Sequence, residues 1–465
     1  MTNTVFQLFK ELNQVPRPSW HEERVADWLC LFAEKHKLSY KRDAHNCMLI
    51  SKAGTAGHEK APVTVLHAHM DMVCVADEGK EFNPLTDPIE AYVDNGWMKA
   101  RGTSLGADNG MGLCMALAVM ASTTLEHGPL ELFVTTNEED GMTGAANVAP
   151  DFVTGRWMID LDSEDYDTIT TGAAGAYLQN HSLPLKRIAA PEDILYNYNK
   201  VSIYSGPGGH SGVDINKGRN SAVKDICLLL RQMLDDDPSM VIAEITAGEA
   251  NASIPSRATA IIGIRQSGVE KKAYAQEPKF QPLDEKPETI IQTQSVEALL
   301  RAVDAIPYGV IKMSERMEGT VETSNNIGVI RTESDHFHLT THTRSFIDQT
   351  MIQTGQAIAR VISEQGGSSE IVMSTPAWQE RTDSPFMQLV EQTFVDVLGF
   401  RPRKVEMHFV MEMGYFVERF PGIQIIPIGP RILEPHSTNE RVEISTIENI
   451  WKVLVELLRR MATEE

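Results

Sequence analysis

The sequence predicts an α/β fold, a mixed sheet flanked by helices, into which a separate α+β unit is inserted. Three observations support this prediction. A chain of 465 residues is too long for one hydrophobic core, so two or three domains are expected. Short apolar runs alternate with helical patterns over residues 1–185 and again over 372–465, as in an α/β sheet. Residues 186–371 show a different order of strands and helices, which indicates the inserted unit.

The first α/β segment begins with a helical pattern over residues 4–36 that is broken at Pro16-Arg17-Pro18. Ser19 and Glu22 have the spacing of a capping box, which predicts the start of the second helix. Apolar runs predict strands over 46–51, 62–66, 130–135 and 157–161. The glycine-rich turn at 102–110 precedes an apolar helix over 111–122.

The inserted segment and the C-terminal segment complete the predicted elements. In the insertion, strands are expected over 195–204, 240–246, 258–265, 328–332 and 336–344, and helices over 222–234, 296–305 and 352–365. In the C-terminal segment, a helix is expected over 385–398, a strand over 423–427 and a final helix over 445–462. The C-terminal segment therefore returns to the α/β pattern of the first segment.

Composition and charge exclude several classes of partner. The formal net charge of -22 argues against nucleic acid or an anionic membrane as partner, because both require a basic surface. The longest apolar stretch, 111–121, is too short to span a bilayer, and the N-terminus has no signal-peptide pattern. The five cysteines are scattered without CxxC spacing, which predicts reduced thiols and a cytoplasmic location.

The segment His67-Ala68-His69-Met70-Asp71 follows a short apolar run that predicts a buried strand. Because side chains alternate along a strand, His69 and Asp71 are expected to point the same way. Ligands of open α/β sheets bind at the carboxyl ends of strands, which is where this pair would lie. Taken alone, the pair would more often be a hydrogen-bonded core histidine and a turn aspartate than a functional site.

Further carboxylates and a second histidine also follow predicted strands or turns. The candidate residues are His69, Asp71, Asp108, Glu138, Glu139, Asp162 and His436. Imidazoles and carboxylates together suit zinc or a similar divalent ion, and one ion needs about four ligands. The larger number of carboxylates indicates two ions that share a bridging group. Each acidic residue could instead be surface charge, but their joint occurrence favours a metal site.

The adjacent pair Glu138-Glu139 suggests a division of roles. Neighbouring like charges at a strand end repel each other, and a purely structural loop rarely needs both. If one carboxylate binds metal, the other can act as the general base toward a water activated by the ions.

Several short motifs in the sequence resemble those of a known family. The chain resembles the dinuclear-metal M20 peptidases over essentially its full length, and among them the bacterial aminoacyl-histidine (Xaa-His) dipeptidases. The motifs that carry the resemblance are His69-x-Asp71, Gly106-Ala107-Asp108-Asn109-Gly110, Glu138-Glu139-Asp140-Gly141-Met142-Thr143-Gly144, Asp162-Ser163-Glu164, Gly208-Gly209-His210-Ser211-Gly212 and Pro435-His436-Ser437. The resemblance implies a zinc-peptidase-like catalytic domain formed by 1–185 and 372–465, with 186–371 as a lid domain.

The resemblance also implies the ligands of two zinc ions per chain, with Mn²⁺ or Co²⁺ as substitutes. His69 and Asp162 would bind one ion. Glu139 and His436 would bind the other. Asp108 would bridge both ions, and its peptide bond to Asn109 would be cis.

The resemblance further implies the catalytic roles. Glu138 would activate the attacking water and later protonate the leaving amine. Asp71 would orient His69 through a hydrogen bond.

Five further residues would contact substrate according to the resemblance. These are His210, Asn251, Arg344, Glu412 and Gly414. His210 would stabilise the oxyanion of the scissile carbonyl, although outside the family it would be interpreted as a turn histidine. Arg344 could grip a free C-terminal carboxylate, or could form a surface ion pair. Glu412 would face the substrate ammonium group, and the backbone of Gly414 would lie near the substrate.

Two positions depart from the family pattern. His67 stands where another polar residue is more common, and it is either an extra ligand or a packed neighbour of His69. Met413 replaces a residue that is commonly cysteine in similar proteins. Both departures concern the side-chain preference of the enzyme rather than the expected metal ligands.

The resulting prediction is a metallo-dipeptidase that hydrolyses short peptides, including Xaa-His dipeptides such as β-alanyl-histidine. No nucleic-acid or membrane partner is expected, and a homodimer through the lid domain is expected from similar proteins. Two alternatives remain open: an M20-type amidohydrolase that acts on N-acyl amino acids, and a non-catalytic peptide-binding relative.

Overall fold

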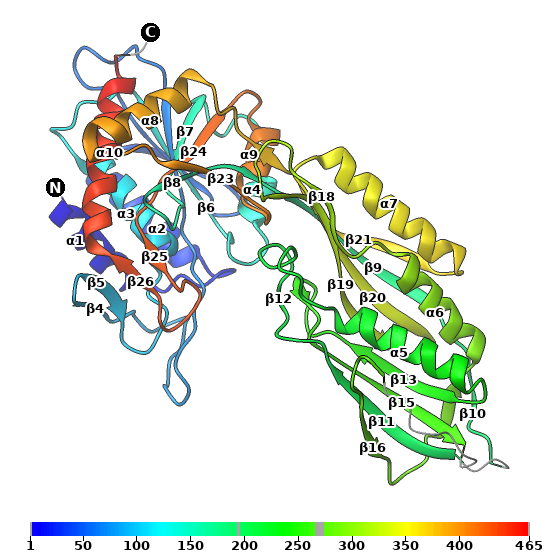
Figure 1. Ribbon diagram of the computed structural model, residues 1–465. Helices are drawn as coiled ribbons and strands as arrows, with labels where there is room; N and C mark the ends of the chain where they lie inside the picture. The colour runs from blue at the N-terminus through cyan, green and yellow to red at the C-terminus, as the bar shows by residue number, and fades with distance from the viewer. Residues whose placement is uncertain (1, 193–195, 266–273, 464–465) are drawn as a thin grey trace. The chain divides into compact units, whose positions relative to one another are not determined.

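The computed structural model describes residues 2–192, 196–265 and 274–463, which form two compact units (Figure 1). Unit 1 consists of Met1–Gly172, Gln379–Glu406 and Glu412–Glu465, and unit 2 consists of Ala173–Trp378 and Met407–Met411.

This division differs from the sequence-based boundaries at 185/186 and 371/372, because the strand next to each boundary pairs within unit 2. Strand β9 (Gly175–Pro184) pairs along its length with β20 (His336–Ser345) and with β21 (Ser368–Thr375). All three strands therefore belong to the sheet of unit 2. The alternation of apolar residues in β9 could not assign it to either unit, because its partners lie far away in the sequence.

Unit 1 is built around a six-stranded sheet that is mixed, as expected. In spatial order its strands are β1 (Ser39–Arg42), β2 (Met48–Lys52), β6 (Leu130–Thr135), β3 (Thr64–His69), β7 (Trp157–Asp160) and β24 (Gln424–Pro427). Strands β6, β3, β7 and β24 are parallel, whereas β1 and β2 are antiparallel to their neighbours. Every residue of β3 and β6 is buried, as expected for strands of a sheet that is covered on both faces.

Helices of unit 1 pack their apolar faces against this sheet and one another. They are α1 (Thr2–Leu12), α2 (Glu23–Lys35), α3 (Ala107–Ala121), α4 (Thr143–Asn147), α8 (Pro385–Leu398), α9 (Met413–Arg419) and α10 (Ile444–Met461). Helix α8 has clear termini: the Ser384 hydroxyl accepts the Met387 N–H, proline occupies the first turn, and Gly399 ends the helix at φ 81°. Helix α10 buries Ile447, Ile450, Leu454 and Leu457 along one face, the spacing of an amphipathic helix.

Smaller strands complete unit 1. An antiparallel sheet has the order β25 (Ile432–Leu433), β26 (Arg441–Glu443), β5 (Trp97–Ala100), β4 (Ala91–Asp94), and a second small sheet has the order β22 (Trp378–Gln379), β8 (Thr168–Ala173), β23 (Arg403–Met407). Asn95 and Gly96, with φ values of 48° and 82°, form the turn between β4 and β5. An Asn-Gly pair is typical of a tight hairpin turn. Apolar periodicity alone did not predict this hairpin.

Unit 2 contains an eleven-stranded sheet with helices on one face. Its main path is β16 (Lys279–Pro282), β11 (Tyr196–Tyr204), β15 (Arg257–Arg265), β13 (Val241–Ala247), β19 (Val321–Thr332), β20, β9, β21, with β10 (Arg187–Ala189), β17 (Thr289–Ile291) and β18 (Gly309–Met313) off this path. Helices α5 (Ala222–Asp236), α6 (Thr293–Ala305) and α7 (Asp348–Glu364) run along the same side of this sheet (Figure 1). A two-stranded pair, β12 (Gly209–His210) with β14 (Ser253–Ile254), carries a glycine-rich turn.

Each predicted helix and strand overlaps one of these elements, but the strand expected over 328–332 is only the end of β19, and one predicted capping contact is absent. The capping box at Ser19 and Glu22 is wrong, because the Ser19 hydroxyl donates to Asp71 Oδ2 at 2.7 Å rather than capping α2. The Glu22 carboxylate instead accepts the N–H groups of Trp20 and Asn137 at 3.0 Å. Residue 195, predicted to begin a strand, lies outside the described residues. Within the described ranges, every helix is too short or too polar to traverse a bilayer.

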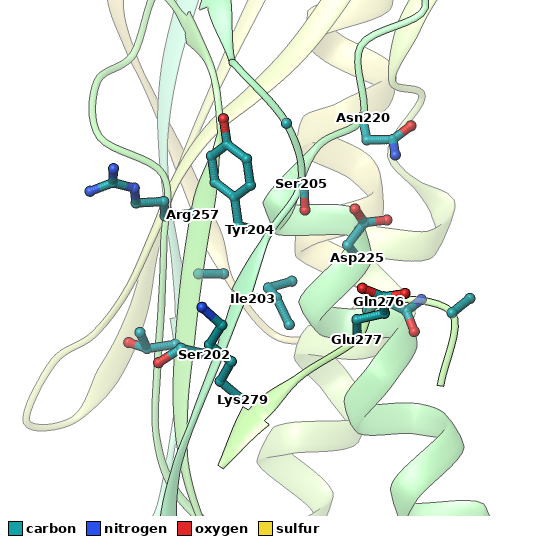
Figure 2. A pocket seen from close by; sticks show the side chains of 14 residues that line it. Ser202, Ile203, Tyr204, Ser205, Asn220, Asp225, Arg257, Gln276, Glu277 and Lys279 are labelled. Carbon is teal, nitrogen blue, oxygen red and sulfur yellow. The ribbon is translucent and has the colours of Figure 1, made fainter. Parts of the chain in front are cut away.

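A groove of about 810 Å³ lies along β11 and β15 of unit 2 (Figure 2). Tyr204, Asp225 and Arg257 are among the side chains that line it. None of the residues that the sequence predicts to bind substrate or metal lines this groove. His69, Glu138, Glu139 and Asp162 lie instead at the carboxyl edge of the unit 1 sheet.

Candidate metal centre

The order of the parallel strands brings the predicted ligands of unit 1 to one edge of the sheet. Strand β3 lies between β6 and β7, and all three end at the same side. His69 is the last residue of β3, Glu138 and Glu139 follow β6, and Asp162 follows β7. In open α/β folds, ligands bind outside the carboxyl ends of the strands, at the point where the strand order reverses.

His69, Asp108 and Asp162 form a first group of possible metal ligands. One ligand atom from each lies within 4.8 Å of the others. His69 Nε2 is 3.1 Å from Asp108 Oδ1 and 3.8 Å from Asp162 Oδ1. These distances are short enough for one cation to sit between the three groups, since ligand atoms about 2 Å from an ion are 3–4 Å apart.

Asp108, Glu139 and His436 form a second such group, which shares Asp108 with the first. His436 Nε2 is 2.8 Å from Glu139 Oε2 and 3.2 Å from Asp108 Oδ2. The two oxygens of Asp108 therefore face different histidines. A carboxylate placed in this way can bridge two ions.

Asp108 occupies an unusual backbone position at the start of α3. The Asp108–Asn109 peptide bond is cis, as the family resemblance implies. Burial by itself would raise the pKa of Asp108, but hydrogen bonds from His436 and His69 hold that pKa below its ordinary value. The carboxylate is thus maintained in the charged form that a bridging ligand requires.

The electrostatics of this cluster favour added positive charge. Burial, reinforced by neighbouring carboxylates, raises the pKa of Glu138 and Asp162 well above the usual range. Hydrogen bonds to Asp108 and Glu139 raise the pKa of His436 to about 11. Buried carboxylates without enough cations are costly, and a divalent ion relieves this cost. Glu139 Oε1 is in addition a buried acceptor without a hydrogen-bond partner in the described chain. The donor set therefore fits a pair of divalent cations.

Glu138 differs from its neighbour Glu139 in having no competing partner. Its carboxylate makes no hydrogen bond to any other described residue, although its backbone N–H donates to Asp71 Oδ1 at 3.1 Å. Its ligand atom can also approach those of His69 and Glu139. A carboxylate with a raised pKa beside a metal centre is suited to accept and release a proton.

Asp71 connects several parts of this site. Its carboxylate accepts hydrogen bonds from the Ser19 hydroxyl and from the backbone N–H groups of Glu138 and Glu139. Its Oδ1 is 3.4 Å from His69 Nδ1, a close contact that is long for a hydrogen bond. Asp71 thus lies where it can orient His69, and it also fixes the backbone of the Glu138-Glu139 pair.

Glu412 and His67 form a buried network beneath the site. Glu412 Oε2 accepts the Thr135 hydroxyl at 2.8 Å and lies 3.4 Å from His67 Nε2. His67 Nδ1 is 2.7 Å from Asp160 Oδ1. Both ring nitrogens of His67 therefore face protein partners, which makes it a packed neighbour of His69 and leaves no nitrogen for a metal. Gly414 lies in the first turn of α9, two residues after Glu412.

The remaining predicted substrate residues belong to unit 2. His210 ends β12, Asn251 lies in the turn before β14, and Arg344 lies in β20. Arg344 is 3% exposed, and its Nε and Nη1 find no hydrogen-bond partner among the described residues. Burial lowers the pKa of Arg344 to about 10. Burial, followed by the nearby charge of Arg344, lowers the pKa of His210 and of the buried His342.

Some residues that support the site were not identified from the sequence. Ser19, Arg17 and Glu440 all contact the loops that carry the predicted ligands. Glu440 lies four residues after the candidate ligand His436, and this proximity is the only feature of the sequence that indicates a role for Glu440 near the site. The partners of Ser19, Arg17 and Glu440 are brought together only by the tertiary fold.

Known proteins resemble this chain over nearly its whole length. It is 31% identical over 478 aligned residues to the cytosol non-specific dipeptidase of Escherichia coli, covering 98% of this chain and 97% of that protein. Among solved structures, the aminoacylhistidine dipeptidase of Vibrio alginolyticus matches with a TM-score of 0.84 and 30% identity, covering 98% of this chain and 96% of the other. An aminopeptidase PepT from Bacillus cereus shares the fold at a TM-score of 0.65 and 16% identity, covering 100% of this chain and 99% of the other.

The family assignment rests on a separate match. The model of peptidase family M20/M25/M40 matches residues 65–460, which include His69, Asp108, Glu139, Asp162 and His436. Together with the full-length relatives, this match means that the chain belongs to peptidase family M20/M25/M40.

Proposed function

We propose that this chain hydrolyses dipeptides, including Xaa-His dipeptides such as β-alanyl-histidine, with the help of two zinc ions. The M20 family is metal-dependent, and the names of the Escherichia coli and Vibrio relatives describe dipeptidases. The observation that carries the proposal is the pair of ligand groups that share Asp108, with Glu138 close to His69 and Glu139 beside them.

The two groups support the assignment of the metal ligands. His69 and Asp162 would hold one ion, Glu139 and His436 would hold the other, and Asp108 would be shared between them. Bound zinc supplies Lewis acidity, which polarises a carbonyl and makes a water more acidic. Mn²⁺ and Co²⁺ accept the same nitrogen and oxygen ligands and are expected to substitute for zinc.

Glu138 is the proposed general base and acid. It removes a proton from the attacking water and delivers one to the amine that leaves. Asp71 holds the backbone N–H groups of Glu138 and Glu139, so that one carboxylate is directed to a metal and the other stays available for proton transfer. This contact gives Asp71 a positioning role in addition to its contact with His69.

Arg344 is the proposed partner of the substrate C-terminal carboxylate. Its buried guanidinium has two nitrogens without a hydrogen-bond partner in the described chain, and burial makes an isolated cation costly. A carboxylate would supply the missing acceptors, and two parallel hydrogen bonds are the favoured geometry. A site that requires this carboxylate next to the cleaved bond would restrict the substrates to very short peptides.

His210 is the proposed donor to the oxyanion that forms on the scissile carbonyl. Its Nδ1 lies 3.2 Å from the backbone N–H groups of both Gly212 and Val213 and therefore acts as an acceptor. In the neutral imidazole the proton must then be on Nε2, which is left as a donor. Asn251, in a turn of the same unit, is proposed to contact the substrate as well.

Glu412 and Gly414 are proposed to recognise the amino end of the substrate. Glu412 Oε1 is buried without a hydrogen-bond partner among the described residues, so it can accept a hydrogen bond from an ammonium group. Such a contact would distinguish a dipeptide from an N-acyl amino acid, which carries no charge at that end.

We also propose a homodimer formed through the lid and a cytoplasmic location. Strand β21 is at one end of the main path of the unit 2 sheet, and its Ile371 and Val372 are 55% and 50% exposed. Exposed apolar residues on an edge strand favour pairing with another chain. The described cysteines are all free thiols, as in reducing compartments. Light scattering of the purified protein and of Ile371→Lys would test the dimer.

A substrate panel tests the proposed activity against its two alternatives. Rates would be measured with β-alanyl-histidine, other dipeptides and N-acetyl amino acids, each after addition of Zn²⁺, Mn²⁺ or Co²⁺. The proposal predicts hydrolysis of dipeptides at rates roughly 30–150-fold above those of N-acetyl amino acids, since a missing buried charge contact costs roughly 2–3 kcal/mol. Faster hydrolysis of N-acetyl amino acids would establish an amidohydrolase. Metal binding without hydrolysis of any of these compounds would establish a binding protein.

A further inference from the structure

The carboxylate of Glu440 is surrounded by backbone N–H groups of the loop that carries Asp108. Glu440 Oε2 accepts from Leu105 and Gly106 at 2.7 and 2.8 Å, and Oε1 accepts from Ala107 and Asp108 at 2.7 and 3.2 Å. The side chain is buried, with 2% exposure. These four donors precede or begin α3 and have no earlier turn to bond with, so one carboxylate satisfies all of them.

Glu440 also belongs to the loop that carries His436. Its backbone N–H donates to Ser437 O at 3.2 Å, and the residue directly precedes β26. One side chain thus joins the backbone of two loops, each of which presents a proposed ligand of the same ion. Glu440 therefore connects the loop of Asp108 to the loop of His436.

Arg17 makes a corresponding connection on the other side of the Asp108 loop. Its Nη2 donates to Gly106 O at 2.7 Å, and its Nη1 donates to Asp71 O at 3.0 Å and to Met70 O at 3.3 Å. Residues 70 and 71 directly follow His69. Arg17 is 1% exposed, and a Cβ at Gly106 would lie 2.5 Å from its Nη2. The glycine is thus required for this close approach as well as for its φ of 67°.

Gly106 is the residue at which the two connections meet. Its N–H donates to Glu440, and its carbonyl accepts from Arg17. A continuous path of hydrogen bonds therefore runs from the loop after His69, through Arg17, Gly106 and Glu440, to the loop of His436. This path spans both proposed metal positions, and Asp108 is attached to its centre.

We propose that Glu440 and Arg17 are positioning residues that hold Asp108 as a bridge and fix the separation of the two metal ions. Neither residue is proposed to bind metal or substrate. The inference rests on the proposed dinuclear function, and it adds the residues that set the geometry of the shared carboxylate. Residues that orient metal ligands in this way typically change metal affinity or activity by roughly 10–100-fold when they are mutated.

Glu440→Gln is the primary test. The amide group of glutamine has one acceptor oxygen, and its NH₂ would face two N–H donors, so the Asp108 loop must shift. We expect zinc retained after dialysis to fall from about two ions per chain toward one, with affinity for the weaker ion reduced roughly 10–100-fold. In protein saturated with Mn²⁺, the magnetic coupling between the ions, measured by electron paramagnetic resonance, should weaken. The value of kcat should fall while KM for a dipeptide changes little.

Glu131→Gln is the matched control. Glu131 is also buried, and its carboxylate accepts the Thr154 N–H, the Thr154 hydroxyl and the Gly155 N–H at 2.6–3.2 Å. It lies near the amino end of β6, whereas Glu138 and Glu139 follow the carboxyl end. Its substitution should lower the melting temperature but leave the metal content and the Mn²⁺ spectrum unchanged.

Arg17→Lys is a second variant for the case that Glu440→Gln does not fold. Lysine keeps the charge but cannot span the three carbonyl groups, and we expect the same weakened coupling. If the variants lose thermal stability like Glu131→Gln yet retain two ions and the wild-type Mn²⁺ spectrum, the inference is wrong and both residues are merely structural. If the wild-type protein itself binds fewer than two ions, the proposed dinuclear function fails instead.

Discussion

The clusters of predicted functional residues in the two units differ in the charge that they bury. The candidate metal centre in unit 1 gathers carboxylates, of which Glu138, Glu139 and Asp162 have raised pKa values because of burial and mutual repulsion. Unit 2 instead buries Arg344 with His342, and burial lowers the pKa of both groups. Each cluster has unpartnered polar atoms among the described residues.

This difference indicates what each unit is arranged to bind. Buried groups without partners reduce stability, so their retention favours a functional explanation. In the unit 1 cluster, Glu139 Oε1 has no hydrogen-bond partner among the described residues, and divalent cations would balance the buried carboxylates. In unit 2, Arg344 Nε and Nη1 have no acceptor among the described residues, and the carboxylate of a peptide would supply one.

Removal of metal should abolish activity. After dialysis against a chelator, hydrolysis of β-alanyl-histidine is expected to fall at least about 1,000-fold, because the Lewis acid and the acidified water are lost together. Addition of Zn²⁺ should restore the rate. The melting temperature should also fall without metal, since the ions bind the folded state only. Full activity in chelated protein would remove the need for cations in unit 1.

Glu138→Gln should separate catalysis from metal binding. We expect kcat to fall by roughly 10²–10⁴-fold, the usual effect of losing a general acid–base, while zinc content stays at the wild-type level. In metal-free protein the same substitution should raise the melting temperature, by roughly 2–4 °C per kcal/mol, because it removes a buried like charge. A near-normal kcat would show that Glu138 is not the base.

Arg344→Met should weaken substrate binding at one end only. Loss of a charged hydrogen-bond pair is worth roughly 1.5–3 kcal/mol, so kcat/KM for a dipeptide should fall about 10–150-fold. The rate with the C-terminal amide of the same dipeptide should change little, because that compound has no carboxylate.

Arg331→Met is the control for this variant. Arg331 lies in the neighbouring strand β19 and donates to Ala247 O and Gly248 O, so its loss should affect stability rather than substrate preference. An equal loss with the acid and the amide substrates would contradict the proposed carboxylate contact.

The pH dependence of unit 2 should follow its buried histidines. His181 is 1% exposed, bonds to the Ser369 and Thr341 hydroxyl groups, and has its pKa lowered to about 4, chiefly by burial and then by the charge of His338. The folded state therefore binds fewer protons than the unfolded state. The stabilising contribution is complete above pH 6.5 and is lost as pH falls toward 4, by roughly 3 kcal/mol in total.

His181→Gln should reduce this acid sensitivity. An amide can keep hydrogen bonds to both hydroxyl groups and does not titrate, so the melting temperature should fall less between pH 6.5 and 4.5 than in the wild type. His336→Gln, at a more exposed position on the same sheet, is the control. Identical acid profiles for the wild type and His181→Gln would mean that other groups set the acid limit of unit 2.

Much of the candidate site in unit 1 could be predicted from the sequence, because each ligand belongs to a short motif next to a strand or turn. His69, Asp108, Glu139, Asp162 and His436 lie together as the family resemblance implied, and their roles as ligands remain to be tested. Parallel strands explain why these motifs converge, since they end at a common edge.

Other features depend on contacts that sequence patterns do not contain. His67 was ambiguous until Asp160 and Glu412 were found beside it. From the sequence, Ser19 could be either a helix cap or a hydrogen-bond partner of Asp71. The fold shows that its hydroxyl donates to Asp71. Arg17 bonds only to backbone carbonyl groups, which any residue can offer.

Anomalous X-ray diffraction from zinc-loaded crystals tests the proposed dinuclear centre itself. We expect two zinc peaks in unit 1, one within about 2.3 Å of His69, Asp162 and Asp108 and the other within the same distance of Glu139, His436 and Asp108. A single peak, or two peaks that do not share Asp108, would contradict the proposed dinuclear site.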